Sequence, residues 1–268
     1  MKIVYRKSRL LGEVLVLLIA SSLVVSAQTI QWKGHVWNVN GGDGIGDAAA
    51  GAQIKGSAKN VEVDADGCLH LKISGTGAGA TGAEIFSADK IGFGSIYYVL
   101  EGPLTSMQKS VVASGFVYGP AAHVGKDGEN ELDIEFSRWN WTAGNINADF
   151  TFYPNTGEAA RKASYEENFL LDLNGGTVVT CRIDWSSTEV TASIWSGVVP
   201  PTASVGTALK THTYKGDAKT IPQSACPMMF NLWTYGAYPT EGVDIVVRDF
   251  RVLTTKRAKG GEDGEFGQ

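Results

Sequence analysis

The stretch from Asn130 to Trp139, NELDIEFSRW, carries acidic side chains at every second position. Glu131, Asp133 and Glu135 alternate with three apolar residues, which is the pattern of a β-strand with one buried face. Such a strand presents all three carboxylates on one side, where like charges repel and are costly to shield from water. Because fold stability does not call for this arrangement, the acids either form a solvated face that resists aggregation or carry out chemistry.

Paired carboxyl groups can supply both a nucleophile and a proton donor to one reaction. A retaining glycosidase needs one ionised carboxylate to attack the anomeric carbon and one protonated carboxyl to donate to the leaving oxygen. A third acid between them adds negative charge, which raises the pKa of a neighbouring carboxyl. Residues four apart on an ideal strand have Cα atoms about 13 Å apart. Glu131 and Glu135 must therefore lean toward each other over the shorter Asp133.

The next apolar-alternating segment can be placed against the acids. We predict that residues 131–137 and 147–153 form an antiparallel hairpin in which Asp149 lies beside Glu135. Phe150 and Phe152 then point to the core. The residues expected to share the acid face are Asn147, Asp149, Thr151 and Tyr153.

The composition indicates an all-β protein. The chain has 33 Gly and 8 Pro residues and no long helical periodicity, and short apolar-alternating segments are separated by Gly, Asn, Asp and Ser. We predict strands within residues 68–74, 94–102, 110–119, 131–139, 146–154, 177–185, 189–197, 227–236 and 243–253. The segments expected to be loops or connections are 41–56, 75–82 and 197–222.

The N-terminus has the pattern of a secretory signal. Basic residues precede a mostly apolar run over 14–25, and the run ends in the small-residue site Val25-Ser26-Ala27. We predict a signal peptide over 1–27, a secreted or periplasmic protein, and no membrane attachment after cleavage. An uncleaved anchor is less favoured because a transmembrane helix needs about 20 apolar residues. One domain is expected over 28–254, followed by a charged, Gly-rich, disordered tail over 255–268.

The net charge of -5 argues against nucleic-acid binding, which requires a basic stripe, and suits a soluble monomer acting on a neutral substrate. Cys68, Cys181 and Cys226 lack a CxxC spacing, so a zinc site is not expected. Whether two of them pair or all remain free thiols is left open. No cofactor or metal is expected in the acid motif, since three acids on one straight strand face cannot readily encircle a calcium ion.

The segment ELDIEF resembles the E-x-D-x-E signature of glycoside hydrolase family 16. Other segments are similar to that family's strands and occur in its order over roughly residues 90–253. They are FGSIYYVLEG, TVVTCRIDWSSTEVTASIWSG, MMFNLWTYG and VDIVVRDFRV. The resemblance implies a β-jelly-roll sandwich of two curved antiparallel sheets with a carbohydrate cleft on the concave face.

Carried over by position, the resemblance implies that Glu131 is the nucleophile, Asp133 the assisting acid and Glu135 the general acid/base of a retaining endo-β-glycosidase. A single residue between Asp133 and Glu135 is similar to lichenases and xyloglucan-active members, which favours mixed-linkage β-1,3-1,4-glucan or a related β-glucan. The alternatives are a transglycosylase that uses the same residues and a lectin-like binding module. Binding alone does not need the paired Glu residues, which argues against the lectin.

Aromatic and polar residues near the motif are candidates for binding a polysaccharide substrate, because sugar rings stack on aromatic faces. The predicted substrate-binding residues are Trp139, Trp141, Asn147, Asp149, Asn231 and Trp233. Trp185 and Trp195 are assigned to the core instead. The segment SRWNW after the motif departs from the Gly-containing turn usual in lichenase-like members, which puts the subsite layout beside the acid/base in doubt.

Overall fold

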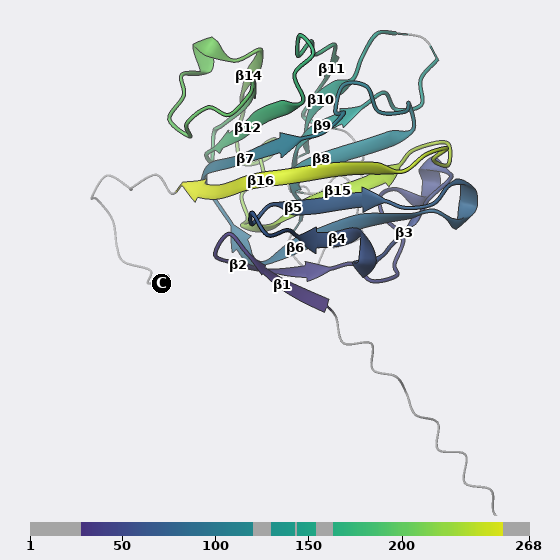
Figure 1. Cartoon of the computed structure of the whole chain (residues 1–268). Helices are drawn as coiled ribbons and strands as arrows, with labels where there is room; N and C mark the ends of the chain where they lie inside the picture. Colours follow the sequence, from purple (N-terminus) through teal and green to yellow (C-terminus); the bar gives the residue numbers. More distant parts are fainter. Residues whose placement is uncertain (1–27, 120–129, 143, 154–162, 254–268) are drawn as a thin grey trace, which may run out of the picture.

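The computed structural model describes residues 28–119, 130–142, 144–153 and 163–253, which form two stacked, mainly antiparallel sheets (Figure 1). This confirms the predicted all-β jelly-roll sandwich. The predicted signal peptide and the predicted C-terminal tail lie outside the described residues. Within the described ranges, no helix is both long enough and apolar enough to cross a membrane.

The first sheet carries the acid motif. Its strand order is β1-β2-β6-β15-β8-β9-β10-β11, and the short β3 pairs in parallel with β6. The bounds are β1 Gln28–Trp32, β2 His35–Val39, β3 Lys55–Gly56, β6 Thr81–Ile91, β8 Val111–Val117, β9 Glu131–Ser137, β10 Ala148–Tyr153, β11 Tyr165–Phe169 and β15 Cys226–Thr234.

The second sheet backs the first, with the order β14-β13-β12-β7-β16-β5-β4. Its bounds are β4 Val61–Val63, β5 Leu69–Ile73, β7 Gly94–Glu101, β12 Val178–Trp185, β13 Glu189–Ser196, β14 Lys210–Lys215 and β16 Val243–Leu253. In Figure 1, β16 is the yellow strand that runs between β7 and β5, its antiparallel partners. Short 3-10 helices lie at Ala48–Ala50, Ala58–Asn60, Gly77–Gly79 and Val205–Thr207.

The core forms where the inward faces of the two sheets meet. On β9, Leu132, Ile134 and Phe136 are fully buried, as the alternation predicts. From the second sheet, Tyr98 reaches across and donates its hydroxyl hydrogen bond to the carbonyl oxygen of Gly115 at 2.8 Å. A Cβ at position 115 would lie 2.6 Å from the Tyr98 ring, so only glycine fits under this contact.

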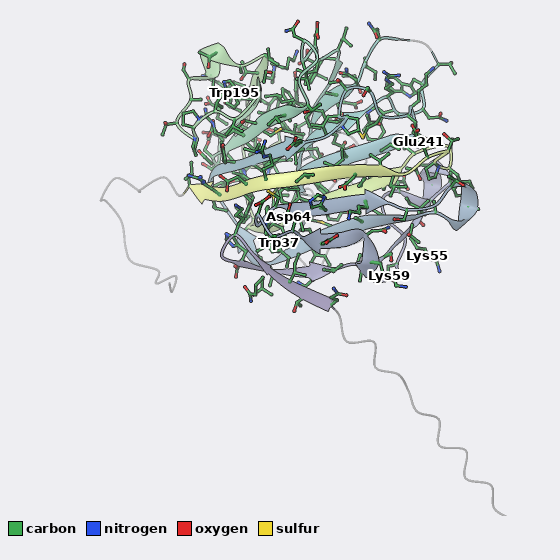
Figure 2. All side chains as sticks on the ribbon, viewed as in Figure 1. Trp37, Lys55, Lys59, Asp64, Trp195 and Glu241 are labelled. Carbon is green, nitrogen blue, oxygen red and sulfur yellow. The ribbon has the colours of Figure 1, made fainter. Side chains whose placement is uncertain are left out.

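The predicted core tryptophans are confirmed, because Trp185 and Trp195 are 3% and 2% exposed. Figure 2 labels Trp195 and also Trp37, which packs at the opposite end of the sandwich. Among the three cysteines, all are free thiols, and Cys181 and Cys226 are buried.

Each of the nine predicted strand segments contains one strand, respectively β5, β7, β8, β9, β10, β12, β13, β15 and β16. The expectation of an unstructured connection over 197–222 is wrong, because it contains β14. This strand lies at the edge of its sheet and alternates half-buried with exposed polar residues, so it lacks the apolar signature. The central strand β6 was also missed, because it begins in the Gly-rich segment 75–82. The two-residue strand β3 was missed as well, since it lies at the end of the predicted loop 41–56.

A charged cluster on the second sheet ties β5 to β16. The Nδ1 atom of His70 lies 3.1 Å from an Asp244 carboxylate oxygen, and its Nε2 atom lies 3.2 Å from Asp64. Burial alone would lower the pKa of His70, but the hydrogen bonds to Asp244 and Asp64 outweigh burial and raise it. The protonated imidazolium can donate to both aspartates, whereas neutral His70 can donate to only one.

Candidate active site

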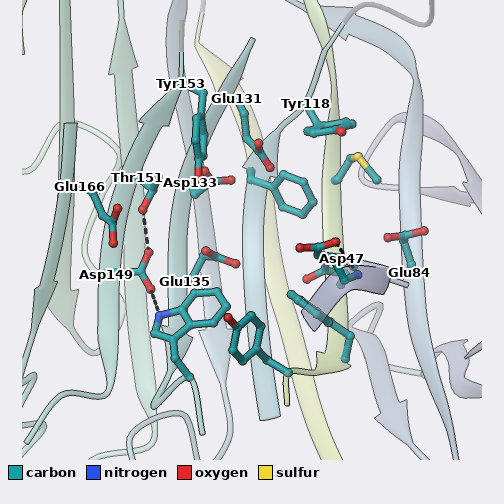
Figure 3. Close-up of a pocket in the computed structure, with 18 of the residues that line it drawn as sticks. Asp47, Glu84, Tyr118, Glu131, Asp133, Glu135, Asp149, Thr151, Tyr153 and Glu166 are labelled. Carbon is teal, nitrogen blue, oxygen red and sulfur yellow. Dashed lines mark hydrogen bonds between the residues drawn. The ribbon is translucent and has the colours of Figure 1, made fainter. Parts of the chain in front are cut away.

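An open cleft of about 850 Å³ lies over the first sheet (Figure 3). Its floor is made by the outward-facing residues of β6, β15, β8, β9, β10 and β11, and the loop over residues 44–49 covers one side. The cleft therefore exists because strands with one apolar face bury that face against the second sheet and leave the polar face open.

The acids of β9 line the middle of this cleft. Glu131 and Asp133 are 9% and 3% exposed, and Glu135 is partly exposed. Ser114, the cross-strand neighbour of Glu135 on β8, donates a hydrogen bond to Glu135 Oε1 at 2.6 Å. The pleat thus holds all three carboxyl groups on one wall of a solvent-accessible groove, with the fully apolar face of β9 behind them.

The predicted hairpin between β9 and β10 is confirmed, including its register. Asp149 lies directly opposite Glu135, and Thr151 lies opposite Asp133. Burial raises the pKa of Asp149 well above its ordinary value, and the negative charge of Glu135 raises it further. Hydrogen bonds from Thr151 and Trp139 act in the opposite direction. The second strand therefore adds a carboxyl group that resists ionisation beside Glu135.

Three aromatic residues form a cluster at one side of the acids. Trp139 packs edge-on against Tyr235, with ring centroids 5.3 Å apart, and the Trp139 indole N–H donates to Asp149 Oδ2 at 3.0 Å. The ring centroids of Trp233 and Trp139 are 6.4 Å apart, and Trp233 is only 6% exposed. A Cβ at Gly46 would lie 2.2 Å from the Trp233 ring, so this glycine packs directly on it. Trp233 thus lines the cleft without presenting an open ring face.

Three residues that line the cleft carry a buried polar atom with no hydrogen-bond partner among the described residues: Oδ1 of Asn168, Oδ1 of Asn231 and Nε1 of Trp233. Asn231 and Trp233 are 5% and 6% exposed. An unsatisfied buried polar group costs about 1–3 kcal/mol, so a ligand that forms hydrogen bonds with these atoms recovers that free energy. Trp141, by contrast, lines the cleft with a ring that is 47% exposed and is open to stack on a sugar.

The structure does not bring Asn147, which the sequence assigned to substrate binding, to the cleft. Its amide nitrogen donates to the Leu171 carbonyl oxygen at 2.9 Å, and its Oδ1 accepts from the Leu171 backbone N–H at 2.8 Å. Asn147 is buried and is not among the residues that line the cleft. It precedes β10, so the strand alternation that we extended to it does not hold at this position.

The other sequence-predicted residues all line the cleft, and further polar residues that the sequence did not suggest join them, among them Glu84, Glu166 and Asn168. Glu84 on β6 accepts a hydrogen bond from Asn40 at 2.9 Å, and burial raises the pKa of Glu84. Glu166 and Asn168 extend the opposite end on β11. The alternation of Ala83 and Ile85 with Glu84 could have indicated a strand, whereas the short polar β11 gives no such signal.

Among the described residues, no group of three or more His, Cys, Asp or Glu side chains is placed to hold a metal ion. The carboxyl, amide and aromatic groups of the cleft can transfer protons, attack carbon and bind sugar hydroxyls.

Comparison of the chain with protein-family models gave no match, and comparison with curated proteins gave none either. Solved structures are similar throughout the sandwich. A Bacillus licheniformis β-glucanase has a TM-score of 0.63 at 18% identity, covering 84% of this chain and 95% of its own. A Flavobacterium laminarinase has a TM-score of 0.58 at 14% identity, covering 81% and 93%.

A third similar structure is a Bacteroides ovatus glycoside hydrolase family 16 protein of a mixed-linkage glucan locus, in complex with its product. It has a TM-score of 0.58 at 16% identity and covers 81% of this chain and 94% of its own. The chain therefore has the jelly-roll fold of the family 16 glycoside hydrolases. At these identities the comparison defines the fold, and the chemistry follows from the residues in the cleft.

Proposed function

We propose that this protein is a secreted, retaining endo-β-glycosidase of glycoside hydrolase family 16 that hydrolyses a β-glucan. The observation that carries the proposal is the placement of Glu131, Asp133 and Glu135 in a line on the wall of an open cleft. A solvated, aggregation-resistant strand face would not need a groove, and Glu131 and Asp133 are largely withdrawn from solvent.

The proposed reaction is a double displacement. The Glu131 carboxylate attacks the anomeric carbon while Glu135 gives its proton to the glycosidic oxygen, so the glycosidic bond breaks and a glycosyl ester forms on Glu131. Glu135 then removes a proton from water, the water oxygen attacks the same carbon, and the ester bond breaks. Asp133 lies between the two and helps to orient Glu131 and to hold the negative charge in place. The configuration at the anomeric carbon is inverted in each step, so the product keeps the β configuration of the substrate.

The charge of the cleft favours a neutral polysaccharide. The acidic residues that line it are Asp47, Glu84, Glu131, Asp133, Glu135, Asp149 and Glu166. Among the described residues that line it, none is Lys, Arg or His. Sulfate or uronate groups of an anionic polymer would lie beside several carboxyl groups there, and like-charge contacts cost several kcal/mol. A glucan offers hydroxyl groups, which both donate to carboxylates and satisfy the free atoms of Asn231 and Trp233.

The proposed substrate is mixed-linkage β-1,3-1,4-glucan. The uninterrupted pairing of β9 with β10 over Glu131–Glu135 supports this choice, since a regular catalytic strand is the feature that resembles lichenases. The open cleft also fits internal attack on a long chain, because neither end of the substrate needs to be bound.

The test is incubation of the protein from residue 28 onward with barley-type mixed-linkage glucan, laminarin, xyloglucan and a sulfated galactan, followed by sizing of the products. We expect short oligosaccharides from mixed-linkage glucan and none from the sulfated polymer. Longer products than the starting chains would indicate a transglycosylase. Binding without any product would overturn the enzyme assignment in favour of a lectin-like module.

A further inference from the structure

The last strand of the cleft floor, β11, presents two polar side chains that the proposed reaction does not use. Glu166 is exposed and Asn168 is half-buried, and both line the cleft. The Asn168 amide nitrogen donates to Glu166 Oε1 at 3.2 Å. Because the carboxylate takes the amide nitrogen, the amide oxygen is left over, and it has no hydrogen-bond partner among the described residues. Asn168 therefore carries an acceptor that a ligand hydroxyl can satisfy.

The strand order sets how far these two side chains lie from the acids of β9. Strand β11 is the second strand from β9 on one side, beyond β10, and β15 is the second strand on the other side, beyond β8. Neighbouring strands are about 4.8 Å apart, so β11 and β15 each lie about 10 Å from β9. Among the described residues, the other unpartnered amide oxygen that lines the cleft belongs to Asn231 on β15. Figure 3 likewise shows Glu166 and Glu84 on opposite sides of the β9 acids. A sugar chain that crosses the strands thus meets an unpartnered acceptor on each side of the acids.

The opposite face of β11 packs against the core. The Tyr165 ring lies against Phe152 with centroids 5.4 Å apart, and the Phe169 ring lies against Phe150 with centroids 4.9 Å apart. Successive side chains of a strand point to opposite faces. The aromatic contacts therefore fix the direction of the two polar side chains between them, which point into the cleft.

A clasp of side chains, formed by Tyr165, Glu167, Phe169, Lys210 and His212, joins this face of β11 to β14, the edge strand of the second sheet. Lys210 donates to Glu167 Oε1, and the Tyr165 hydroxyl donates to Glu167 Oε2 at 2.5 Å. The Tyr165 ring stacks on His212 with centroids 3.8 Å apart, and the Lys210 ammonium lies 4.8 Å from the centre of the Phe169 ring. Burial alone would raise the pKa of Glu167, but the hydrogen bonds from Lys210 and Tyr165 outweigh burial and lower it, so the ion pair stays charged. An edge strand has a hydrogen-bonded neighbour on one side only, and the clasp supports β11 on the other.

We infer that Glu166 and Asn168 form a sugar-binding subsite on β11, two strands away from the acids, and that the clasp holds this subsite in place. The inference rests on the proposed function for its substrate, a neutral glucan, and deepens it, because the preferred substrate must be long enough to reach from the acids to β11. The Glu166 carboxylate and the Asn168 amide oxygen both accept hydrogen bonds. The subsite therefore selects a ring with free hydroxyl groups, since sulfated or etherified positions have no hydrogen to donate.

The test measures binding in place of turnover. In the Glu135→Gln protein, the affinity for mixed-linkage gluco-oligosaccharides of increasing length is measured by titration calorimetry, with and without Asn168→Ala. Loss of one hydrogen bond corresponds to about a three- to tenfold loss of affinity. We expect this loss for long oligosaccharides and a smaller one for those that cover the acids without reaching β11. Asn38→Ala is the matched control, because Asn38 is a half-buried asparagine on β2 of the same sheet that does not line the cleft. An equal loss at every length, or the same loss in Asn38→Ala, would overturn the inference.

A second readout locates the sugar. In nitrogen-15 NMR, the side-chain amide signal of Asn168, assigned by its loss in Asn168→Ala, should shift when a long oligosaccharide is added. The indole N–H signal of Trp233 reports binding on the other side of the acids. A shift of Trp233 without one of Asn168 would overturn the subsite and leave the proposed function intact. Shifts of both signals in a protein that cleaves no glucan would support the subsite and refute the enzyme assignment. If neither signal shifts, the subsite is refuted, and digestion of the polymer decides the function separately.

The clasp is tested from outside the cleft. Lys210→Met removes the ammonium that pairs with Glu167, and Lys210 does not line the cleft. We expect the same length-dependent loss of affinity as in Asn168→Ala, and recovery in Lys210→Arg, which keeps the charge. Lys72→Met is the control, because it breaks a comparable ion pair with Glu62 on the second sheet, 2.9 Å long, and should leave the affinity unchanged. Full affinity for long oligosaccharides in Lys210→Met, or an equal loss in Lys72→Met, would refute the role of the clasp.

Discussion

Replacement of Glu135 by glutamine isolates the proton-donating step. The substitution keeps the shape of the side chain and its Oε1 atom, so the Ser114 hydroxyl can still donate its hydrogen bond. It removes the acidic proton, and it also removes the charge that raises the pKa of the facing Asp149. We therefore expect a folded protein that has lost general acid catalysis.

The size of the effect follows from these contacts. General acid–base catalysis contributes about 10²–10⁴-fold, which corresponds to about 2.7–5.4 kcal/mol of transition-state stabilisation. The change in stability is much smaller. The Ser114 hydroxyl keeps an oxygen acceptor in the variant, so the change in the free energy of unfolding is at most about 1 kcal/mol. Unfolding cannot account for a loss of several hundredfold.

The assay compares two leaving groups. On mixed-linkage glucan, where the departing sugar oxygen needs a proton, kcat should fall by about 10²-fold or more. On an aryl β-glycoside with an acidic phenol, formation of the glycosyl intermediate should be nearly unaffected, because the phenolate leaves without protonation. Glu84→Gln is the control, since the same chemical change in the same cleft should affect both substrates alike.

Equal losses on the two substrates in Glu135→Gln, with the unfolding midpoint unchanged, would refute its assignment as proton donor. A larger loss on the aryl substrate than on the glucan would reverse the assignment and make Glu135 the nucleophile. Urea unfolding of the variant shows whether the fold is intact.

Three other predictions concern the nucleophile, the aromatic cluster and the second sheet. Glu131→Ala should be inactive, but azide should restore cleavage and give an α-glycosyl azide from the β-linked substrate, as proton NMR would show; a β-glycosyl azide would identify Glu131 as the acid/base. Gly46→Ala should displace Trp233, because the added Cβ would lie 2.2 Å from its ring; we expect KM to rise severalfold with kcat little changed, and an unchanged KM would show that this ring does not bind substrate. The folded-state pKa of His70 is raised, so its stabilising contribution is present below the unfolded pKa of about 6.5 and is lost as pH rises through the folded pKa. His70→Gln should therefore lower the urea midpoint more at about pH 5.5 than at about pH 8.5, and an equal drop at both would exclude the ionic contact with Asp244 as the cause.

The sequence by itself determined the face on which the motif acids lie. Alternation of Glu131, Asp133 and Glu135 with fully buried residues leaves only one side of β9 for the carboxyls, since the side-chain period of a strand is two. The same rule placed Asp149 on the face of Glu135, because a register shift by one residue would exchange core and cleft. A shift by two residues would keep the face, so the direct pairing of Asp149 with Glu135 comes from the structure. Local pattern is sufficient wherever one face of a strand is strongly apolar.

The pattern fails where burial is weak or comes from a distant part of the chain. Strands β11 and β14 are short sheet edges with mixed polarity, so their residues carry no periodic apolar signal. Asn147 shares the parity of Asp149, yet its side chain is used to hold the backbone of Leu171. The sequence contains no sign of that contact, because it depends on where the chain returns after β11.

Only the tertiary structure decided how the carboxyl groups differ from one another. Glu84 reaches the cleft from β6, and the indole of Trp139 turns back onto Asp149 after leaving β9 in a backbone conformation with φ of 50°. These contacts join segments whose separation in sequence says nothing of their distance in space. The pKa of a carboxyl group depends on its burial and on the charges and donors around it. The sequence therefore identifies which acids are available, and the packing of the two sheets determines which of them keeps a proton.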